Sequence, residues 1–286
     1  MYDLYRKFSN DAKVFFYSND KCPYKDYADF IRKQYEPYMK NDDPETRRIK
    51  DSMIRRLLKQ ETLETSSNAM EHISIDDYGS YLKLTGPDFE FPGGFSSLIE
   101  FLAEDLPKDS IKLNHAVENI SITGNYDPAK SSNNNVKVKC FNGKTFITNH
   151  VIVTCSLNYL KKNYSTLFQP GLLSKKKFDA LHSIKMGVVN KIFLVYEDLD
   201  SFFPKDFSSI HPLFFNDENY DPKTEWYLKM FNFDRFYDNV ILVWMTGAEA
   251  AHTENLSEHE IAEILVKFMK KFLKNENIPM PKKVIR

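Results

Sequence analysis

A short apolar segment, residues 186–197, constrains the fold more than any other part of the chain, because Lys191 lies in its middle. A strand alternates its side chains between two faces, so Val189, Lys191 and Phe193 share one face, and Val188 belongs to the other. Both faces are largely apolar, which predicts a strand covered on both sides. An ammonium there pairs with an acid, reaches water along its stem, loses its proton or takes part in chemistry. Lys191 is therefore a candidate functional residue, and an edge-strand lysine is the structural alternative.

Charge and cysteine usage exclude several classes of protein. The 286 residues are 42% hydrophobic, enough for a sizeable core, and the net charge of -1 provides no basic field for nucleic acid or an anionic membrane. The three cysteines are widely spaced and form no Cys-x-x-Cys motif, which favours a reducing compartment, and we expect a cytoplasmic protein. The histidines lack metal-ligand spacing, so no metal site is expected. No apolar run is long enough to cross a bilayer.

Capping signals mark the start of several helices. Asp43 followed by Pro44 predicts a helix start, and a helical apolar stripe follows. Ser257 and Glu260 have the spacing of a capping box before a second amphipathic helix. Ser97 and Glu100 have the same spacing, in a short helix that follows a Pro-Gly-Gly turn.

Short β-rich segments begin after residue 73 and predict strands at 80–84, 111–122, 136–140, 145–154, 188–196 and 240–246. Residues 124–135 predict a hairpin loop between two of these strands. The strands at 111–122, 136–140 and 145–154, the last of them running into Thr154, Cys155 and Ser156, are similar in arrangement to the β-meander and return strand that some dinucleotide-binding domains insert. Yet none of the nine glycines has the Gly-x-Gly spacing that lets a backbone approach a pyrophosphate.

The chain resembles the flavin-containing amine oxidases. The segments that carry the resemblance occur in order at 92–107, 111–117, 150–161, 168–172 and 186–197. Within that family, the segments 58–70 and 278–286 are most similar to the spermine and polyamine oxidases. The family's Gly-x-Gly-x-x-Gly unit and its last flavin-contacting segment have no match. The chain is therefore expected to be the middle portion of an oxidase, with a genuine short paralogue as the alternative.

The resemblance implies an α/β (α+β) fold that is a fragment of a two-domain oxidase. Residues 1–92 would be the helical part and first strand of a substrate domain, with a sheet and helix in 161–286. Residues 93–160 would be part of a Rossmann-like FAD-binding domain. We expect this chain alone to be incomplete and inactive.

The resemblance also implies an activity for the full-length protein. That activity is the FAD-dependent oxidation of spermine or N-acetylated polyamines to an imine, then to an aldehyde and an amine, with release of hydrogen peroxide. The partners would be a polyamine and dioxygen, with no nucleic acid and no membrane. The sequence predicts neither the preferred polyamine nor the oligomeric state.

Four residues receive roles by resemblance. Lys191 would hold a water near the flavin as a catalytic residue, because a partly desolvated lysine shifts its pKa readily. Val117 would meet the cofactor through its backbone, although a β-branched residue equally suits a buried strand. Glu64 and Ser66 would contact the polyamine, and their structural alternative is an exposed acid and a turn serine at a helix end.

Two rival functions stay open. Another flavin amine oxidase, of the monoamine oxidase or histone-lysine demethylase type, would show the same segments, but the sequence has no coiled-coil arm and no basic surface for chromatin. The second rival is a non-catalytic remnant that acts as an interaction module, which the absent Gly-x-Gly turn favours.

Overall fold

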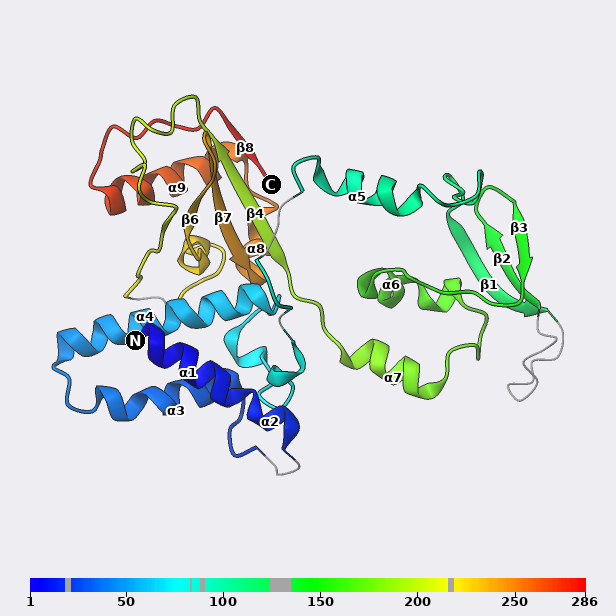
Figure 1. Ribbon diagram of the computed structural model, residues 1–286, viewed down its shortest axis with the longest axis horizontal. Helices are drawn as coiled ribbons and strands as arrows, with labels where there is room; N and C mark the ends of the chain where they lie inside the picture. Colours follow the sequence, from blue (N-terminus) through cyan, green and yellow to red (C-terminus); the bar gives the residue numbers. More distant parts are fainter. Residues whose placement is uncertain (19–21, 83, 88–90, 124–134, 216–218) are drawn as a thin grey trace. The chain divides into compact units, whose positions relative to one another are not determined.

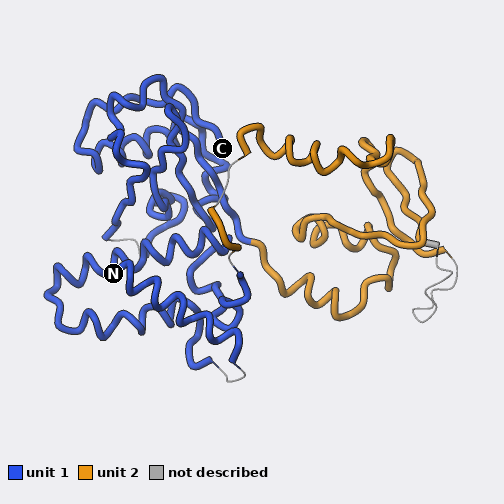
Figure 2. The backbone as a smooth tube through the Cα atoms, in the orientation of Figure 1, with its two compact units in different colours: residues 1–83, 187–286 blue, residues 84–186 orange. Residues whose placement is uncertain are grey.

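The computed structural model describes residues 1–18, 22–82, 84–87, 91–123, 135–215 and 219–286. The chain forms two compact units, one made of residues 1–83 and 187–286 and the other of residues 84–186 (Figure 2). The boundaries between the units lie after residues 83 and 186, whereas the sequence predicts domain boundaries after residues 92 and 160. The assignment of substrate and flavin domains stays a prediction, because compactness does not identify a function.

The first part of the larger unit is helical (Figure 1). Its elements are α1 (Tyr2–Ala12), α2 (Val14–Tyr17), α3 (Tyr27–Met39), α4 (Pro44–Glu64) and the 3-10 turns η1 (Met70–His72) and η2 (Tyr78–Ser80). Aromatic and aliphatic side chains from α1, α3 and α4 form one core, which includes Phe8, Tyr27, Ile31, Tyr35 and Leu58. Burial of these side chains is the main force that holds the helices together.

Helix α4 begins where the sequence predicts. The Asp43 carboxylate accepts hydrogen bonds from the backbone N–H groups of Glu45 and Thr46, and Pro44 occupies the first turn. Ion pairs follow along the exposed side of the helix.

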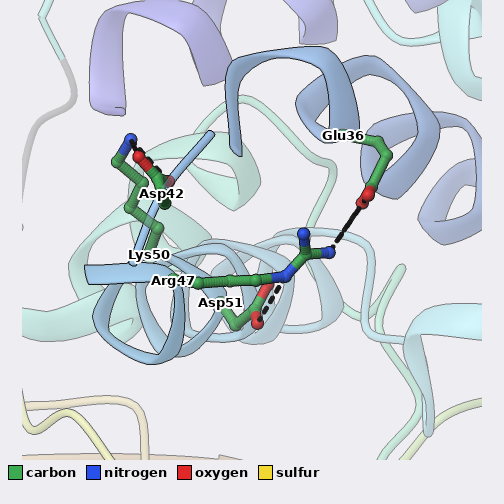
Figure 3. A network of polar contacts seen from close by, with 5 residues as sticks. All are labelled: Glu36, Asp42, Arg47, Lys50 and Asp51. Carbon is green, nitrogen blue, oxygen red and sulfur yellow. Dashed lines mark hydrogen bonds and ion pairs between the residues drawn. The ribbon is translucent and has the colours of Figure 1, made fainter. Parts of the chain in front are cut away.

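These ion pairs link α4 to α3 and to the turn between them (Figure 3). Arg47 pairs with Glu36 of α3 at 2.9 Å, and Lys50 pairs with Asp42 of the turn at 2.8 Å. Exposed pairs of this kind contribute little individually, about 0–1 kcal/mol. The buried core therefore sets the position of α4, and the ion pairs support it.

An antiparallel five-stranded sheet forms the second part of the larger unit, in the order β5-β6-β7-β4-β8. The strands are β4 (Val189–Val195), β5 (Ser209–Ile210), β6 (Phe233–Tyr237), β7 (Val240–Thr246) and β8 (Lys283–Ile285). A 3-10 turn, η3 (Trp226–Lys229), and two helices, α8 (Gly247–Thr253) and α9 (Glu258–Leu273), complete this part. Ile192, Leu194 and Val243 of the sheet share one core with Ile261 and Leu265 of α9.

The predicted capping box of α9 is confirmed. The Ser257 hydroxyl accepts from the Glu260 backbone N–H, and the Glu260 carboxylate accepts from the Ser257 backbone N–H. Two orphan donors of the first turn are thus satisfied by local residues. The local sequence is sufficient to start this helix.

The smaller unit contains a three-stranded antiparallel sheet, β1 (Val117–Thr123), β2 (Asn135–Cys140) and β3 (Thr145–Thr148). Its helices are α5 (Gly94–Ala103), α6 (Leu157–Leu167) and α7 (Lys175–Ser183). Helix α6 lies beside β1, where Asn119 donates to the carbonyl of Thr166. Helix α5 is apolar in sequence, yet it has no buried residue. Its apolar surface therefore lacks cover within the part of the chain that the structure describes.

The class of fold, helices combined with sheets, agrees with the expectation, and several local predictions are wrong. Residues 78–80 form η2, where a strand was expected to begin at residue 80, and β1 starts only at Val117. The strand expected to end at residue 154 stops at Thr148, and Ile152 is 88% exposed. No described strand pairs with residues 149–154. Ser97 lies inside α5 and donates to the carbonyl of Gly94, so the second capping box does not form. The predicted hairpin loop at 124–135 lies almost wholly outside the described residues.

Candidate functional site

Lys191 lies in the middle of β4, directly opposite Trp244 of β7. Directly opposed residues of an antiparallel pair project from the same face of the sheet. The Nζ of Lys191 is 4.4 Å from the centroid of the Trp244 ring, which is within the range of a cation–π contact. The indole therefore fixes where the ammonium lies.

Strand β4 is covered on one face only. Asn190, Ile192 and Leu194 are buried beneath α8 and α9, whereas Lys191 is exposed and Val189 is 37% exposed. The expectation of cover on both faces is therefore wrong for the part of the chain that the structure describes. Lys191 holds its ammonium over the Trp244 ring while the residue as a whole stays exposed.

Glu64 ends α4 and Ser66 lies in the turn that follows, and both are exposed. Glu64 is the last residue of the helix, and its Oε1 accepts a hydrogen bond from Gln60 Nε2 at 2.9 Å. Ser66 has a φ of 51°, in the left-handed region that non-glycine residues rarely adopt. Such strain persists only where the surroundings hold the backbone in place.

The surroundings that hold this turn are the start of β4 and the end of β7. A Cβ atom on Gly187 would lie 1.6 Å from the Ser66 carbonyl oxygen, and one on Gly247 would lie 2.6 Å from the carbonyl oxygen of Asn68. Asn68 Oδ1 also accepts from the backbone N–H of Val188 at 2.8 Å. The two glycines thus allow a backbone approach that any side chain would prevent.

This contact brings two predicted site segments together. Gly187 precedes Lys191 by four residues, a span of roughly 13 Å in extended backbone. Lys191, Glu64 and Ser66 therefore belong to one compact unit, with the Ser66 turn fixed at the start of the lysine strand.

A buried carboxylate anchors the last turn of α4. Glu61 accepts hydrogen bonds from Tyr5 of α1 at 2.7 Å and from Tyr78 of η2 at 3.0 Å, and Tyr27 donates to Tyr5. Burial raises the pKa of Glu61, and the two tyrosine hydroxyls oppose that rise. The network holds the helix turn that ends at Glu64.

Val117 belongs to the smaller unit. It is the first residue of β1, it is half-buried, and it pairs with Cys140 of β2 next to an irregularity in the register. Its predicted role toward a cofactor stays a prediction.

Sequence reasoning missed Trp244, Asn68 and the pair Gly187 and Gly247. Trp244 lies in a strand that the sequence predicts, but which residue faces Lys191 depends on strand register, and a single sequence does not show it. A glycine beside each of two predicted strands is a signal of close backbone approach that was available.

Within the described ranges, no cluster of metal-ligating side chains occurs. No described helix has the length and apolar character needed to span a membrane.

Comparisons with known proteins extend over nearly the whole chain. Residues 29–286 match the family described as flavin containing amine oxidoreductase. The peroxisomal N(1)-acetyl-spermine/spermidine oxidase of Bos taurus is 26% identical over 272 residues, which cover 91% of this chain and 52% of that protein. Its Homo sapiens counterpart is 27% identical over 280 residues, 93% of this chain and 54% of that protein. The chain therefore spans about half the length of these curated relatives.

Two solved structures share the fold. A putrescine oxidase variant matches with a TM-score of 0.55 and 15% identity, over 99% of this chain and 59% of that one. Cyclohexylamine oxidase from Brevibacterium oxydans IH-35A matches with a TM-score of 0.52 and 13% identity, over 99% of this chain and 59% of that one. At such identities the likeness concerns architecture alone, and it confirms the expected fold class.

Proposed function

The chain belongs to the flavin-containing amine oxidoreductase family, and we propose that it forms most of the substrate domain, with part of the flavin domain, of an FAD-dependent polyamine oxidase. The proposed reaction consumes an N-substituted amine, dioxygen and water. It yields an aldehyde, the released amine and hydrogen peroxide. Spermine and N-acetylated polyamines are the proposed substrates, and the names of the bovine and human relatives support this choice.

One observation carries the proposal: the backbone of the Ser66 turn packs closely against Gly187, just before the strand that bears Lys191. An extended polyamine has cationic nitrogens separated by alkyl chains. Glu64, next to this turn, supplies an exposed carboxylate, and Trp244 supplies an aromatic ring beside Lys191. Such groups can bind one ammonium electrostatically while the alkyl chain lies along apolar groups.

Each residue then has a role in binding or orientation. The Glu64 carboxylate pairs with a substrate ammonium, and the Ser66 hydroxyl accepts a hydrogen bond from a neighbouring N–H of the substrate. Lys191 Nζ has N–H donors for a water molecule, which it holds beside the reacting carbon. Trp244 keeps the Lys191 side chain in one position, so that the water is held in one place.

FAD is the cofactor of the family, and the residues of this chain do not by themselves fit a dinucleotide. No pair among the nine glycines has Gly-x-Gly spacing. The segment after Thr148, expected as the third strand beside the cofactor, is exposed at Ile152 and pairs with no described strand. The cofactor's phosphate cradle is therefore not among these residues, and the roles proposed above are those of substrate and water binding.

A visible absorption spectrum tests the proposal first. The chain, purified with excess FAD, is scanned for the two flavin bands, and peroxide release from spermine and N-acetylspermine is then measured. In a flavin-loaded protein, Lys191→Met should lower the turnover rate by about 10²-fold or more, the usual scale for a group that positions a proton-transfer partner. Lys283→Met, an exposed lysine of β8, serves as the matched control and should leave turnover unchanged.

An unchanged turnover rate in Lys191→Met would contradict a catalytic role for Lys191. A colourless and inactive chain would agree with the expectation that this chain alone is incomplete, and the proposal would then apply only to the full-length protein. The second candidate function is a non-catalytic interaction module, for which the absent Gly-x-Gly spacing is the supporting observation. The cytoplasmic location is likewise a proposal. The peroxisomal names of the two mammalian relatives supply its alternative, and a fluorescent fusion expressed in cells distinguishes the two.

A further inference from the structure

A cavity of about 980 Å³ lies within the larger unit, bordered by α4, residues 68–72, η3 and α8. Its wall includes Val188, the residue before β4, and includes neither Lys191 nor Trp244. The cavity is therefore separate from the surface that bears Lys191 and Trp244.

Two oppositely charged side chains of this wall are buried and do not pair with each other. Lys229 is 7% exposed and Glu249 is 6% exposed, yet no ion pair within 4.0 Å joins them in the part of the chain that the structure describes. Burial lowers the pKa of Lys229, and the nearby carboxylates of Glu249 and Glu71 oppose that effect. Buried charges are ordinarily neutralised by a partner at short range.

Each of the two groups keeps hydrogen-bonding capacity. Lys229 Nζ donates to the carbonyl of Asn68 at 3.2 Å, its one hydrogen bond among the described residues, and an ammonium has three N–H donors. Glu249 Oε1 accepts from the Tyr220 hydroxyl at 2.6 Å, whereas Oε2 has no hydrogen bond from any described residue. One donor site and one acceptor site of opposite charge are thus available in the same cavity.

The other charged residues of the wall have partners of their own. Arg32 pairs with Glu71 at 3.0 Å. Arg55 donates to the carbonyl of Phe214, and Lys59 donates to the carbonyl of Leu228 at 2.6 Å. Asp221 accepts from the backbone N–H of Lys223 at 2.9 Å. Lys229 and Glu249 are therefore the two buried charges on which a ligand of this cavity would act.

We propose that this cavity binds a small zwitterion, an amino acid whose carboxylate accepts from Lys229 and whose ammonium donates to Glu249. A molecule with both charges satisfies both buried groups at once, whereas an anion or a cation satisfies only one. The site goes beyond the oxidation of polyamines, since it needs neither flavin nor turnover.

Isothermal titration of the 286-residue chain tests the proposal with matched ligands. Glycine, 3-aminopropanoate and 4-aminobutanoate carry both charges at increasing separation, whereas propanoate and propylamine carry one each. At least one zwitterion should bind saturably, and both single-charge molecules should bind at least about tenfold more weakly. Absence of saturable binding by every zwitterion overturns the proposal, as does equal binding of a single-charge molecule.

Variants locate the binding. Lys229→Met and Glu249→Gln should each weaken the binding of the tightest-binding zwitterion by at least about tenfold. Lys223→Met, which changes an exposed lysine outside the cavity wall, should leave that binding unchanged. Unchanged binding in both cavity variants overturns the assignment. Circular dichroism establishes that each variant is folded. If Lys229→Met does not fold, the Glu249→Gln variant and the ligand series test the proposal instead. Glu249→Gln is expected to fold, because Gln keeps an acceptor for the Tyr220 hydroxyl.

Discussion

The ammonium of Lys191 lies 4.4 Å from the centroid of the Trp244 ring, across the β4–β7 pair. The two residues lie 53 positions apart in sequence, 244 minus 191, and only the antiparallel register makes them neighbours. Their contact restricts a flexible side chain on an exposed face of the sheet. Any chemistry proposed for Lys191 therefore depends on Trp244 as well.

A double-mutant cycle measures this contact. Lys191→Met, Trp244→Leu and the double variant should show a coupling of about 0.5–1 kcal/mol in the free energy of unfolding, the range for an exposed cation–π pair. Urea unfolding gives the three differences. A parallel cycle of Lys283→Met with Trp244→Leu should show no coupling, because Lys283 pairs with Val195 at the far end of β4. Equal coupling in both cycles would contradict a specific contact.

Local signals explain which elements the sequence predicts correctly. The α4 and α9 starts need only a capping side chain and the next three residues, so Asp43 and Ser257 could be identified without tertiary information. The strand around Lys191 was equally visible, because its apolar run is long and bounded. The exposure of the Lys191 face could not be predicted, because the residues that would bury one face of a strand come from other parts of the chain.

Tertiary partners also explain the failures. The segment after Thr148 has the composition of a strand, yet a strand requires a neighbour for its backbone groups, and none is present among the described residues. Glu64 and Ser66 were found through a resemblance. The residues that seat their turn, Gly187 and Asn68, were missed, because their role follows from a backbone approach between distant segments.

Gly187→Ala should destabilise the larger unit severely. The new methyl group would lie 1.6 Å from the Ser66 carbonyl oxygen, so the Ser66 turn or the start of β4 must move. Overpacking of a backbone contact costs about 3 kcal/mol or more where neither side can yield. Gly143→Ala is the control, since its Cβ would meet nothing within 4 Å and only its φ of 83° opposes the change. Similar midpoints of thermal unfolding for the two variants would show that the turn is mobile.

The apolar surface of α5 should cause self-association of this chain. Phe95 and Phe101 are each 71% exposed, and no residue of the helix is buried. Uncovered apolar patches promote association. Sedimentation velocity should show concentration-dependent oligomers that the double variant Phe95→Ser and Phe101→Ser reduces. Phe141→Ser is the matched control, because that ring is also 71% exposed but lies outside α5. Equal reduction by the control would show that total apolar exposure matters and not the helix.

Glu61 should make the stability of the larger unit fall as pH rises. Burial raises its pKa in the folded chain above the ordinary value of 4.5. Below that value, both the folded and the unfolded chain hold the proton. As pH rises, the unfolded chain releases the proton first, so the folded chain binds more protons and the free energy of unfolding decreases. The decrease from one such group is at most about 1.4 kcal/mol per pH unit and ends above the folded pKa.

Urea unfolding of the wild-type chain and of Glu61→Gln at a series of pH values isolates this contribution. The free energy of unfolding of the wild-type chain minus that of Glu61→Gln should be largest at about pH 4. It should decline at higher pH, because Gln does not ionise. Tyr5→Phe removes a hydrogen bond that lowers the pKa of Glu61, so in that background the decline should continue to higher pH. A difference that rises with pH would mean that the carboxylate is stabilised in the folded chain. The tyrosine hydroxyls, and not burial, would then control the charge of Glu61.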